Sequence, residues 1–173
     1  MGYAGGTTKD PTYHSIGDHS ETIQVDYEPT KISYEKLLDV FWQSNNHDSR
    51  PYSRQYMSLV LHHNEEQRQS ALATKKREEA RLGRKLYAEI VPLASFYLAE
   101  DYHQKYYLRG VKELAGEFAE IYPDPARFVA STAVARVNGY AARLGTLSQL
   151  EDEIKVLGLS PAGEKRLRGI VGR

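Results

Sequence analysis

The sequence predicts an α+β fold followed by an all-helical region, and three observations support this class. Residues 21–28 alternate apolar and polar side chains, which is the pattern of a half-buried strand. Strand-like and helix-like patterns then succeed one another as far as residue 93. From residue 99 onward, apolar residues recur only at the spacing of a helix face. Mixed elements followed by helices alone are typical of an α+β core with a helical extension.

The first half of the chain contains three predicted strands. Residues 2–17 read as a loop, because glycines, threonines and an Asp-Pro pair recur there. The strand at 21–28 places Ile23, Val25 and Tyr27 on one face. The other two strands are expected at 55–63 and 86–93.

Two helices are predicted between these strands. Ser33 is a suitable N-cap for a helix to about Ser44. Asn64-Glu-Glu-Gln67 has the form of a capping box and begins a second helix, which ends at Gly83. The charged run at 75–79 indicates that much of the second helix is solvated.

The last third of the chain predicts helices only. A first helix spans 111–122 and is broken by Pro123-Asp-Pro125, and the next helix runs to about Leu144. Two shorter helices follow, at 148–157 and after the Ser160-Pro161 start signal. Three strands make a thin sheet layer, since an α+β core usually has four or more. We therefore expect a further strand to precede Gly2 in a complete protein.

Composition excludes several classes of function. Lys and Arg number 23, as do Asp and Glu, so the net charge of zero does not favour nucleic acid or an anionic membrane as partner. No apolar run approaches the roughly 18 residues of a spanning helix, and no secretory signal opens the chain, so a cytoplasmic location is expected. The chain has no cysteine, which excludes disulfides and any thiol nucleophile of its own. The histidine pairs at 14 and 19 and at 62 and 63 lack the spacing of zinc motifs.

Seven segments carry a resemblance to a known family. They are GYAGG at 2–6, PTY at 11–13, GDHSETIQVDYEP at 17–29, ISYEKLLDVFW at 32–42, HDSR at 47–50, RQYMS at 54–58 and AEDYHQKYY at 99–107. In this order they resemble the methionine-S-sulfoxide reductases (MsrA). The later segment STAVARVNGYAARL, at 131–144, is similar to the C-terminal extension of a divergent branch of that family. The resemblance implies an MsrA-like core over residues 1–109 and a helical extension over 110–173.

The resemblance also implies a ferredoxin-like α+β core. In the family, the first strand ends in a Gly-Cys-Phe-Trp motif, whose cysteine stands at the start of the first helix. This chain begins at the later GYAGG turn. A front segment on the order of 40 residues, with the first strand, the first helix and most of the second strand, is therefore expected to be missing.

The family reaction is the reduction of methionine-S-sulfoxide, free or in proteins, by a thiol. A thiolate attacks sulfur, and the departing oxygen requires hydrogen-bond donors and an acid. By resemblance, Glu21 is the acid, and Tyr13 and Tyr56 hold the sulfoxide oxygen. Without the resemblance, a glutamate at a strand start is more often a solvated residue, and tyrosine is common in strands. No cofactor is implied, and thioredoxin is a candidate reductant for a full-length form.

Two departures from the family pattern bear on activity. The cysteine and the Phe-Trp pair of the methyl pocket fall in the absent segment, so we expect no thiol-dependent turnover from this chain. The run NNHDSRPYSRQYMS is shorter than its family counterpart, which leaves Asp48 as a poor match for an orienting acidic residue. Three hypotheses follow: an incomplete reductase, a non-catalytic binding or interaction protein of the same fold, and a remnant that does not fold stably.

Overall fold

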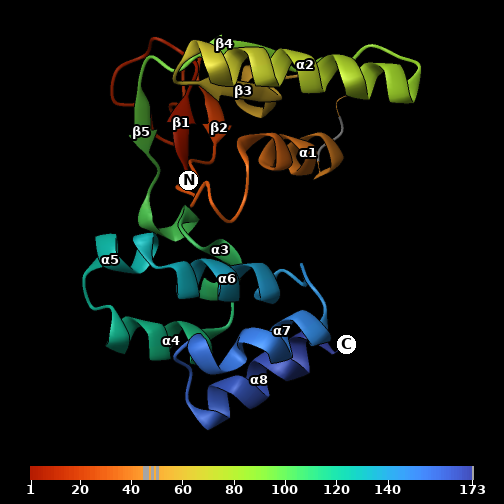
Figure 1. Ribbon diagram of the computed structural model, residues 1–173. Coiled ribbons are helices and arrows are strands. Elements are labelled where there is room, and N and C mark those ends of the chain that lie inside the picture. The colour runs from red at the N-terminus through yellow and green to blue at the C-terminus, as the bar shows by residue number, and fades with distance from the viewer. Residues whose placement is uncertain (45–46, 48, 50, 173) are drawn as a thin grey trace. The chain divides into compact units, whose positions relative to one another are not determined.

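The computed structural model describes residues 1–44, 47, 49 and 51–172. The chain divides into two compact units, Met1–Glu100 and Asp101–Arg173 (Figure 1). The first unit is a mixture of strands and helices, and the second is helical. The α+β class with a helical C-terminal region is therefore confirmed.

A three-stranded antiparallel sheet contains the first residues of the chain. Its order is β2 (Ser20–Thr22), β1 (Gly2–Ala4), β5 (Phe96–Leu98). The prediction of a loop throughout 2–17 was wrong at its start, because β1 is the central strand and Tyr3 is fully buried. Gly2 permits this close pairing, since a Cβ there would lie 2.3 Å from the carbonyl oxygen of Tyr97. The prediction also missed β5.

The strand expected at 21–28 is much shorter than predicted. Only Ser20–Thr22 pairs, and Thr22 lies opposite Gly2 at the end of the register. Beyond Thr22, therefore, β1 offers almost no further backbone to pair with. Ile23 and Val25 continue the alternation without regular structure and are 74% and 55% exposed. The sequence pattern there is that of a strand, but among the described residues no strand pairs with 23–27.

A second sheet has two parallel strands, β3 (Leu59–His62) and β4 (Glu89–Pro92). Both strands lie within predicted ones, and both are shorter than predicted. The start of the predicted strand at 55–63 is instead covered by a 3-10 turn, η1 (Arg54–Tyr56). Pro92 ends β4, as a proline that cannot donate to the sheet would.

The two predicted helices of this unit are confirmed as α1 (Tyr34–Ser44) and α2 (Glu65–Leu82). The Ser33 hydroxyl accepts from the N–H of Lys36 at 3.2 Å. The Asn64 side chain accepts from the N–H of Gln67, and the Gln67 side chain accepts from His63, one residue earlier than in a capping box. Gly83 ends α2 with a positive φ of 68°.

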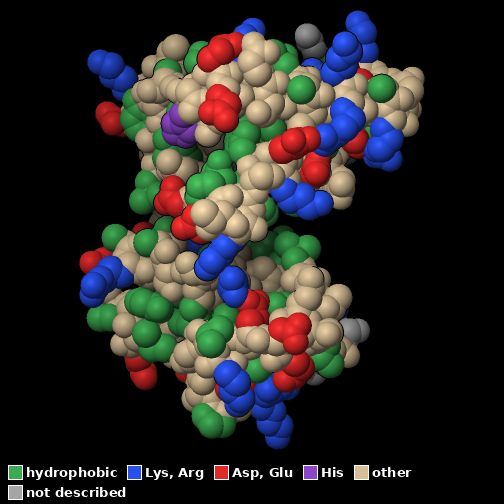
Figure 2. Space-filling view, viewed as in Figure 1, with side chains coloured by type: hydrophobic (Ala, Val, Ile, Leu, Met, Phe, Trp, Pro, Cys, Tyr) green, Lys and Arg blue, Asp and Glu red, His purple; other side chains and the backbone are tan. Residues whose placement is uncertain are grey.

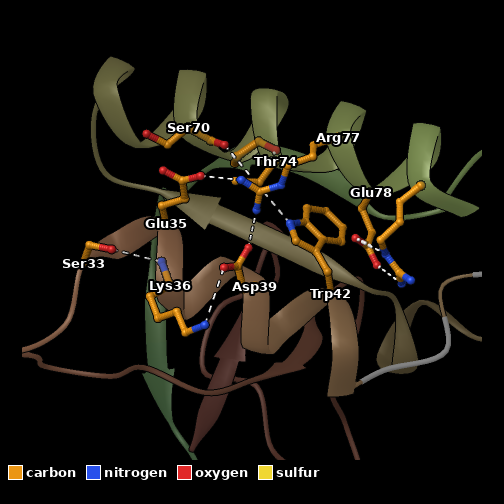
Figure 3. A network of polar contacts seen from close by, with 11 residues as sticks. Ser33, Glu35, Lys36, Asp39, Trp42, Ser70, Thr74, Arg77 and Glu78 are labelled. Atoms are coloured by element: carbon orange, nitrogen blue, oxygen red, sulfur yellow. Dashed lines mark hydrogen bonds and ion pairs between the residues drawn. The ribbon is translucent and has the colours of Figure 1, made fainter.

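Helices α1 and α2 share the core of the first unit. Its buried residues are Leu38, Trp42, Val60, Ala71, Leu86 and Ala88. The indole N–H of Trp42 donates to the Thr74 hydroxyl at 3.0 Å in this buried contact (Figure 3). Nearby, Arg77 pairs with both Glu35 and Asp39. Within the charged run of α2, Lys76 and Arg77 are exposed, as predicted, whereas Glu78 is buried and pairs with Arg81. Basic and acidic side chains are interspersed along the helix (Figure 2).

The second unit is a group of short helices around one apolar core. They are η2 (Asp101–His103), α3 (Tyr106–Arg109), α4 (Lys112–Ile121), α5 (Pro125–Ala130), α6 (Thr132–Ala141), α7 (Leu147–Glu153), η3 (Ile154–Val156) and α8 (Pro161–Val171). The helix predicted to run to Leu144 is in fact two, because Ser131 ends α5 and caps α6. Ser160 is the N-cap of α8, as predicted. The almost fully buried side chains of this core include Phe118, Leu108, Leu114, Leu150, Ile154 and Leu167.

The compact units divide at residue 100, and α3 packs with α6 in the second unit. The predicted end of the family core at residue 109 refers to sequence similarity and not to the compact units. It therefore stays a prediction. Among the described helices, none is long and apolar enough to cross a membrane.

Candidate functional site

The structure brings together the three side chains singled out from the sequence. Tyr13 lies in the loop between β1 and β2, Glu21 in β2, and Tyr56 at the end of η1. Tyr56 lies close enough to both Tyr13 and Glu21 for each of them to act electrostatically on its hydroxyl. One carboxyl and two phenol groups therefore share one site, although 43 residues separate Tyr13 from Tyr56 in the chain.

The loop that carries Tyr13 is fixed by side-chain contacts. The Asp18 carboxylate accepts from the backbone N–H and the hydroxyl of both Thr7 and Thr8, at 2.7–2.9 Å. These hydrogen bonds, that of the Thr8 hydroxyl first, hold the pKa of Asp18 well below its ordinary value. The buried His19 ring accepts from the N–H of Gly6 and donates to the carbonyl of Thr8. The glycine-rich turn is thus tied to the residues just before Glu21.

Glu100 holds Tyr13 from the other end of the first unit. One carboxylate oxygen accepts from the hydroxyl of Tyr3 at 2.6 Å, and the other accepts from the N–H of Tyr13 at 3.0 Å. The sequence analysis did not single out Glu100, although it lies in the AEDYHQKYY segment. It fixes the backbone of a site residue 87 positions earlier.

The turn η1 is anchored on both sides. The Ser20 hydroxyl donates to the Arg54 carbonyl at 2.6 Å, which ties η1 to β2. The Arg54 guanidinium donates to Glu89 of β4 at 2.8 Å and to the Gly5 carbonyl at 3.3 Å. These contacts place the two residues after Arg54 against β2.

Gln55 is a second site residue that the sequence analysis missed. Its Nε2 donates to Oε1 of Glu21 at 2.7 Å, so it orients the carboxyl group. The only signal in the sequence was its position beside Tyr56 in RQYMS. That position beside Tyr56 does not by itself indicate that Gln55 contacts Glu21 of β2.

The Tyr56 hydroxyl keeps its proton at neutral pH and can donate a hydrogen bond. The neighbouring Tyr13, followed by burial, raises the pKa of Tyr56 above its ordinary value of 10.0. Tyr56 is therefore protonated throughout the neutral range. Its ring is 46% exposed, and the 91% exposed Tyr52 lies 5.6 Å from it between ring centroids. A small molecule in solution can reach these groups.

Other candidate groups have different places. The His14 ring lies edge-on to Tyr13, with centroids 5.3 Å apart, and His19 is part of the loop structure described above. Among the described residues, no three His, Asp or Glu side chains are grouped to hold a metal ion. Asp48 lies outside the described residues.

A groove of about 950 Å³ opens beside the site, and Glu21, Gln55 and Tyr56 are part of its wall. Most of the other lining comes from residues 22–27, from one face of α1 and from residues 57–61. The groove is largely apolar on the α1 side, where Leu37, Leu38 and Phe41 line it.

Comparison with known proteins shows the family to which the chain belongs. A model of the peptide methionine sulfoxide reductase family matches residues 1–131, and the chain belongs to this family. It is 43% identical over 165 residues to a peptide methionine sulfoxide reductase of Drosophila melanogaster, covering 93% of this chain and 65% of that protein.

Two further relatives match in the same way. Identity is 40% over 118 residues to the MsrA of Methanosarcina acetivorans, covering 62% of this chain and 63% of the relative. Identity to peptide methionine sulfoxide reductase A5 of Arabidopsis thaliana is 37% over 154 residues, covering 83% and 58%. The chain thus spans about three fifths of the length of these relatives. The family match extends beyond residue 109, the limit expected for the core.

Proposed function

We propose that Tyr13, Glu21 and Tyr56 form the oxygen-binding half of a methionine-S-sulfoxide reductase site, with Gln55 orienting Glu21. The observation that carries this proposal is the meeting of the three side chains beside an open groove. The core of the complete protein is proposed to be ferredoxin-like. Its substrate is methionine sulfoxide, free or in proteins, and thioredoxin is the proposed reductant of a longer form.

The chemistry assigns each group a task. A thiolate forms a bond to the sulfoxide sulfur while the S–O bond breaks and the protonated oxygen leaves as water. Water then attacks the cysteine sulfur and breaks the S–S bond, which releases the thioether and leaves the thiol oxidised to a sulfenic acid. The sulfoxide oxygen gains negative charge as the S–O bond weakens. The Tyr13 and Tyr56 hydroxyls donate hydrogen bonds to it, and Glu21 supplies a proton. A dithiol then reduces the sulfenic acid to the thiol, with release of water and formation of a disulfide.

The chain contains no cysteine, so it supplies the acid and the donors but not the nucleophile. Alone, it should bind a sulfoxide and leave it unreduced. A titration with one peptide, containing either methionine-S-sulfoxide or methionine, tests this half of the site. The sulfoxide peptide should bind more tightly, because only it presents a sulfoxide oxygen to accept hydrogen bonds from the site.

Variants make the titration specific to the site. Tyr56→Phe removes a donor and should reduce the preference for the sulfoxide by about tenfold, as expected for a hydrogen bond of roughly 1.4 kcal/mol. Tyr87→Phe changes a comparably exposed tyrosine outside the site and should have no effect. Equal affinity for both peptides, or no affinity for either, would contradict the proposal.

A second candidate function is that of a non-catalytic binding protein of the same fold. The lack of cysteine favours it. Both functions predict the same titration result. They differ in whether the sulfoxide is reduced when a thiol is supplied to the site.

A further inference from the structure

Two tyrosine rings meet at the surface of the candidate site. Tyr52 is 91% exposed, and Tyr56, which follows it one turn later, is 46% exposed. Their ring centroids are 5.6 Å apart and their planes are inclined by 49°, so the rings are neither stacked flat nor edge-on. The proposed function gives a task to Tyr56 and none to Tyr52. The contact between the two rings therefore has no explanation in the reduction chemistry.

The turn η1 holds the two rings at this separation. The Ser53 carbonyl accepts from the N–H of Tyr56 at 3.2 Å, which closes the turn between the two tyrosines. The Ser20 hydroxyl donates to the Arg54 carbonyl at 2.6 Å, which fixes the same turn to β2. Tyr52 and Tyr56 remain neighbours because the backbone between them is hydrogen-bonded both to itself and to the sheet.

The composition leaves exposed tyrosine as the side chain most open to one-electron oxidation. The chain has no cysteine, and thiols are ordinarily among the first groups to be oxidised. Its single tryptophan, Trp42, is only 5% exposed. Of its 13 tyrosines, Tyr52 is the most exposed. An oxidant as large as an enzyme can reach this ring, and the ring of Tyr56 lies beside it.

We propose that Tyr52 and Tyr56 are a site of oxidative coupling, at which a peroxidase and hydrogen peroxide join the two rings into a dityrosine. The oxidant removes one electron and one proton from each phenol. The two phenoxyl radicals form a carbon–carbon bond ortho to the hydroxyls, and the hydrogens on those carbons move to the oxygens, which restores both phenols. In total, two hydrogen atoms leave the protein, and one hydrogen peroxide becomes two waters.

Coupling also changes the oxygen-binding group. A coupled phenol has a lower pKa than tyrosine, because its phenolate accepts a hydrogen bond from the hydroxyl of the second ring. The Tyr56 ring is moreover held against Tyr52 and no longer turns towards a ligand. Its hydroxyl therefore stops donating to a sulfoxide oxygen. This consequence rests on the proposed function, whereas the coupling itself depends only on the exposure and separation of the rings.

The coupling is tested on the purified chain, treated with a haem peroxidase and hydrogen peroxide at a protein concentration low enough to disfavour bonds between chains. Trypsin cleaves after Arg54, which lies between the two tyrosines, so only a coupled pair keeps the two flanking peptides joined. Mass spectrometry should find the joined peptide, lighter than the two free peptides together by two hydrogen atoms. Dityrosine fluorescence should appear with it. Tyr52→Phe should abolish both signals.

Tyr106 and Tyr107 provide a matched control. Their ring centroids are also 5.6 Å apart, and both rings are more than half exposed. Their interplanar angle is 82°, so the edge of one ring points at the face of the other, which does not bring the ortho carbons together. Tyr106→Phe should therefore leave the yield of dityrosine unchanged.

The peptide titration measures the consequence for the site. After treatment, the unchanged chain should lose about tenfold of its preference for the sulfoxide peptide, as expected when one hydrogen bond is lost. The treated Tyr52→Phe chain should keep its preference, because its Tyr56 has no ring to couple with. This comparison separates coupling from oxidation at any other residue.

The outcomes separate this proposal from the proposed function. Absence of the joined peptide, coupling of Tyr56 to Tyr13 instead, or bonds only between chains would overturn the coupling site. A coupled chain that keeps its full preference for the sulfoxide would overturn the loss of donation by Tyr56. A coupled pair in a chain that shows no preference before treatment leaves the coupling site standing and contradicts the proposed function.

Discussion

Asp18 shows how single side chains shape the site, because it gathers four donors from Thr7 and Thr8 and thereby fixes the loop that leads to Tyr13 and Glu21. The carboxylate is at the surface, so its contribution consists of loop geometry more than of burial. Glu100 and Gln55 act in the same way, because Glu100 fixes the backbone of Tyr13 and Gln55 orients the carboxyl group of Glu21.

Replacing Asp18 should change how stability depends on pH. Because its folded-state pKa is lowered from 3.8, Asp18 stabilises the fold fully above that value, and the contribution is lost as the pH falls through the folded pKa. Asp18→Asn should therefore lower the melting temperature at pH 7 and flatten the loss of stability below about pH 4. Asp10→Asn, in the same loop, is the control. Parallel melting curves of Asp18→Asn and the unchanged chain from pH 7 to pH 2 would contradict this role.

The titration of Tyr56 should depend on the presence of the Tyr13 hydroxyl. Tyr13 is the first cause of the raised pKa of Tyr56, so Tyr13→Phe should move that pKa towards 10.0. Carbon-13 NMR of the labelled tyrosine ring, measured from pH 8 to pH 12, reports it. If the titration of Tyr56 is the same in Tyr13→Phe, the two hydroxyls do not meet in solution.

At the scale of elements, the buried contact between α1 and α2 should matter more than their surface ion pairs. Thr74→Val leaves the indole N–H of Trp42 without its acceptor inside the core and should cost about 1–3 kcal/mol of unfolding free energy. Thr74→Ser keeps the acceptor and should recover most of that loss. Arg77→Gln removes two exposed ion pairs and should cost less than Thr74→Val in chemical denaturation. The reverse order would contradict this ranking.

The second unit has a comparable contact between α6 and α7. The Tyr140 hydroxyl donates to Glu153 at 2.7 Å, and burial together with this bond raises the pKa of Tyr140 from 10.0 to about 12. Because the folded pKa is raised, the contribution to stability is complete below pH 10 and is lost as the pH rises through about 12. Tyr140→Phe should cost about 1 kcal/mol at neutral pH. The difference in unfolding free energy between Tyr140→Phe and the unchanged chain, measured in urea, should shrink above pH 10. A difference that stays constant with pH would exclude this hydrogen bond as its source.

The elements also show what the sequence could predict. The starts of helices were predictable, because the side chains of Ser33, Asn64 and Ser160 accept hydrogen bonds from N–H groups three residues later in the chain. Strand lengths were not, because pairing depends on distant segments: β1 is central only because β2 and β5 flank it. For the same reason Gln55 and Glu100 were missed, since their partners lie 34 and 87 residues away in the chain.

At the scale of the whole molecule, the chain combines two features: it belongs to the peptide methionine sulfoxide reductase family, and it contains no cysteine. The resemblance singled out Tyr13, Glu21 and Tyr56, which composition and periodicity alone could not have done, and their role as a site stays a prediction. The main error in the predicted strands concerns residues 23–27, which have the alternating pattern of a strand while only Ser20–Thr22 pairs with β1.

The most direct test of the central claim is a reductase assay on the purified, mass-verified chain with methionine-S-sulfoxide and excess dithiothreitol. Chromatography of the product should detect no methionine above the rate without protein, since the chain lacks a nucleophile that can attack sulfur. Methionine formed by the chain alone would contradict the account.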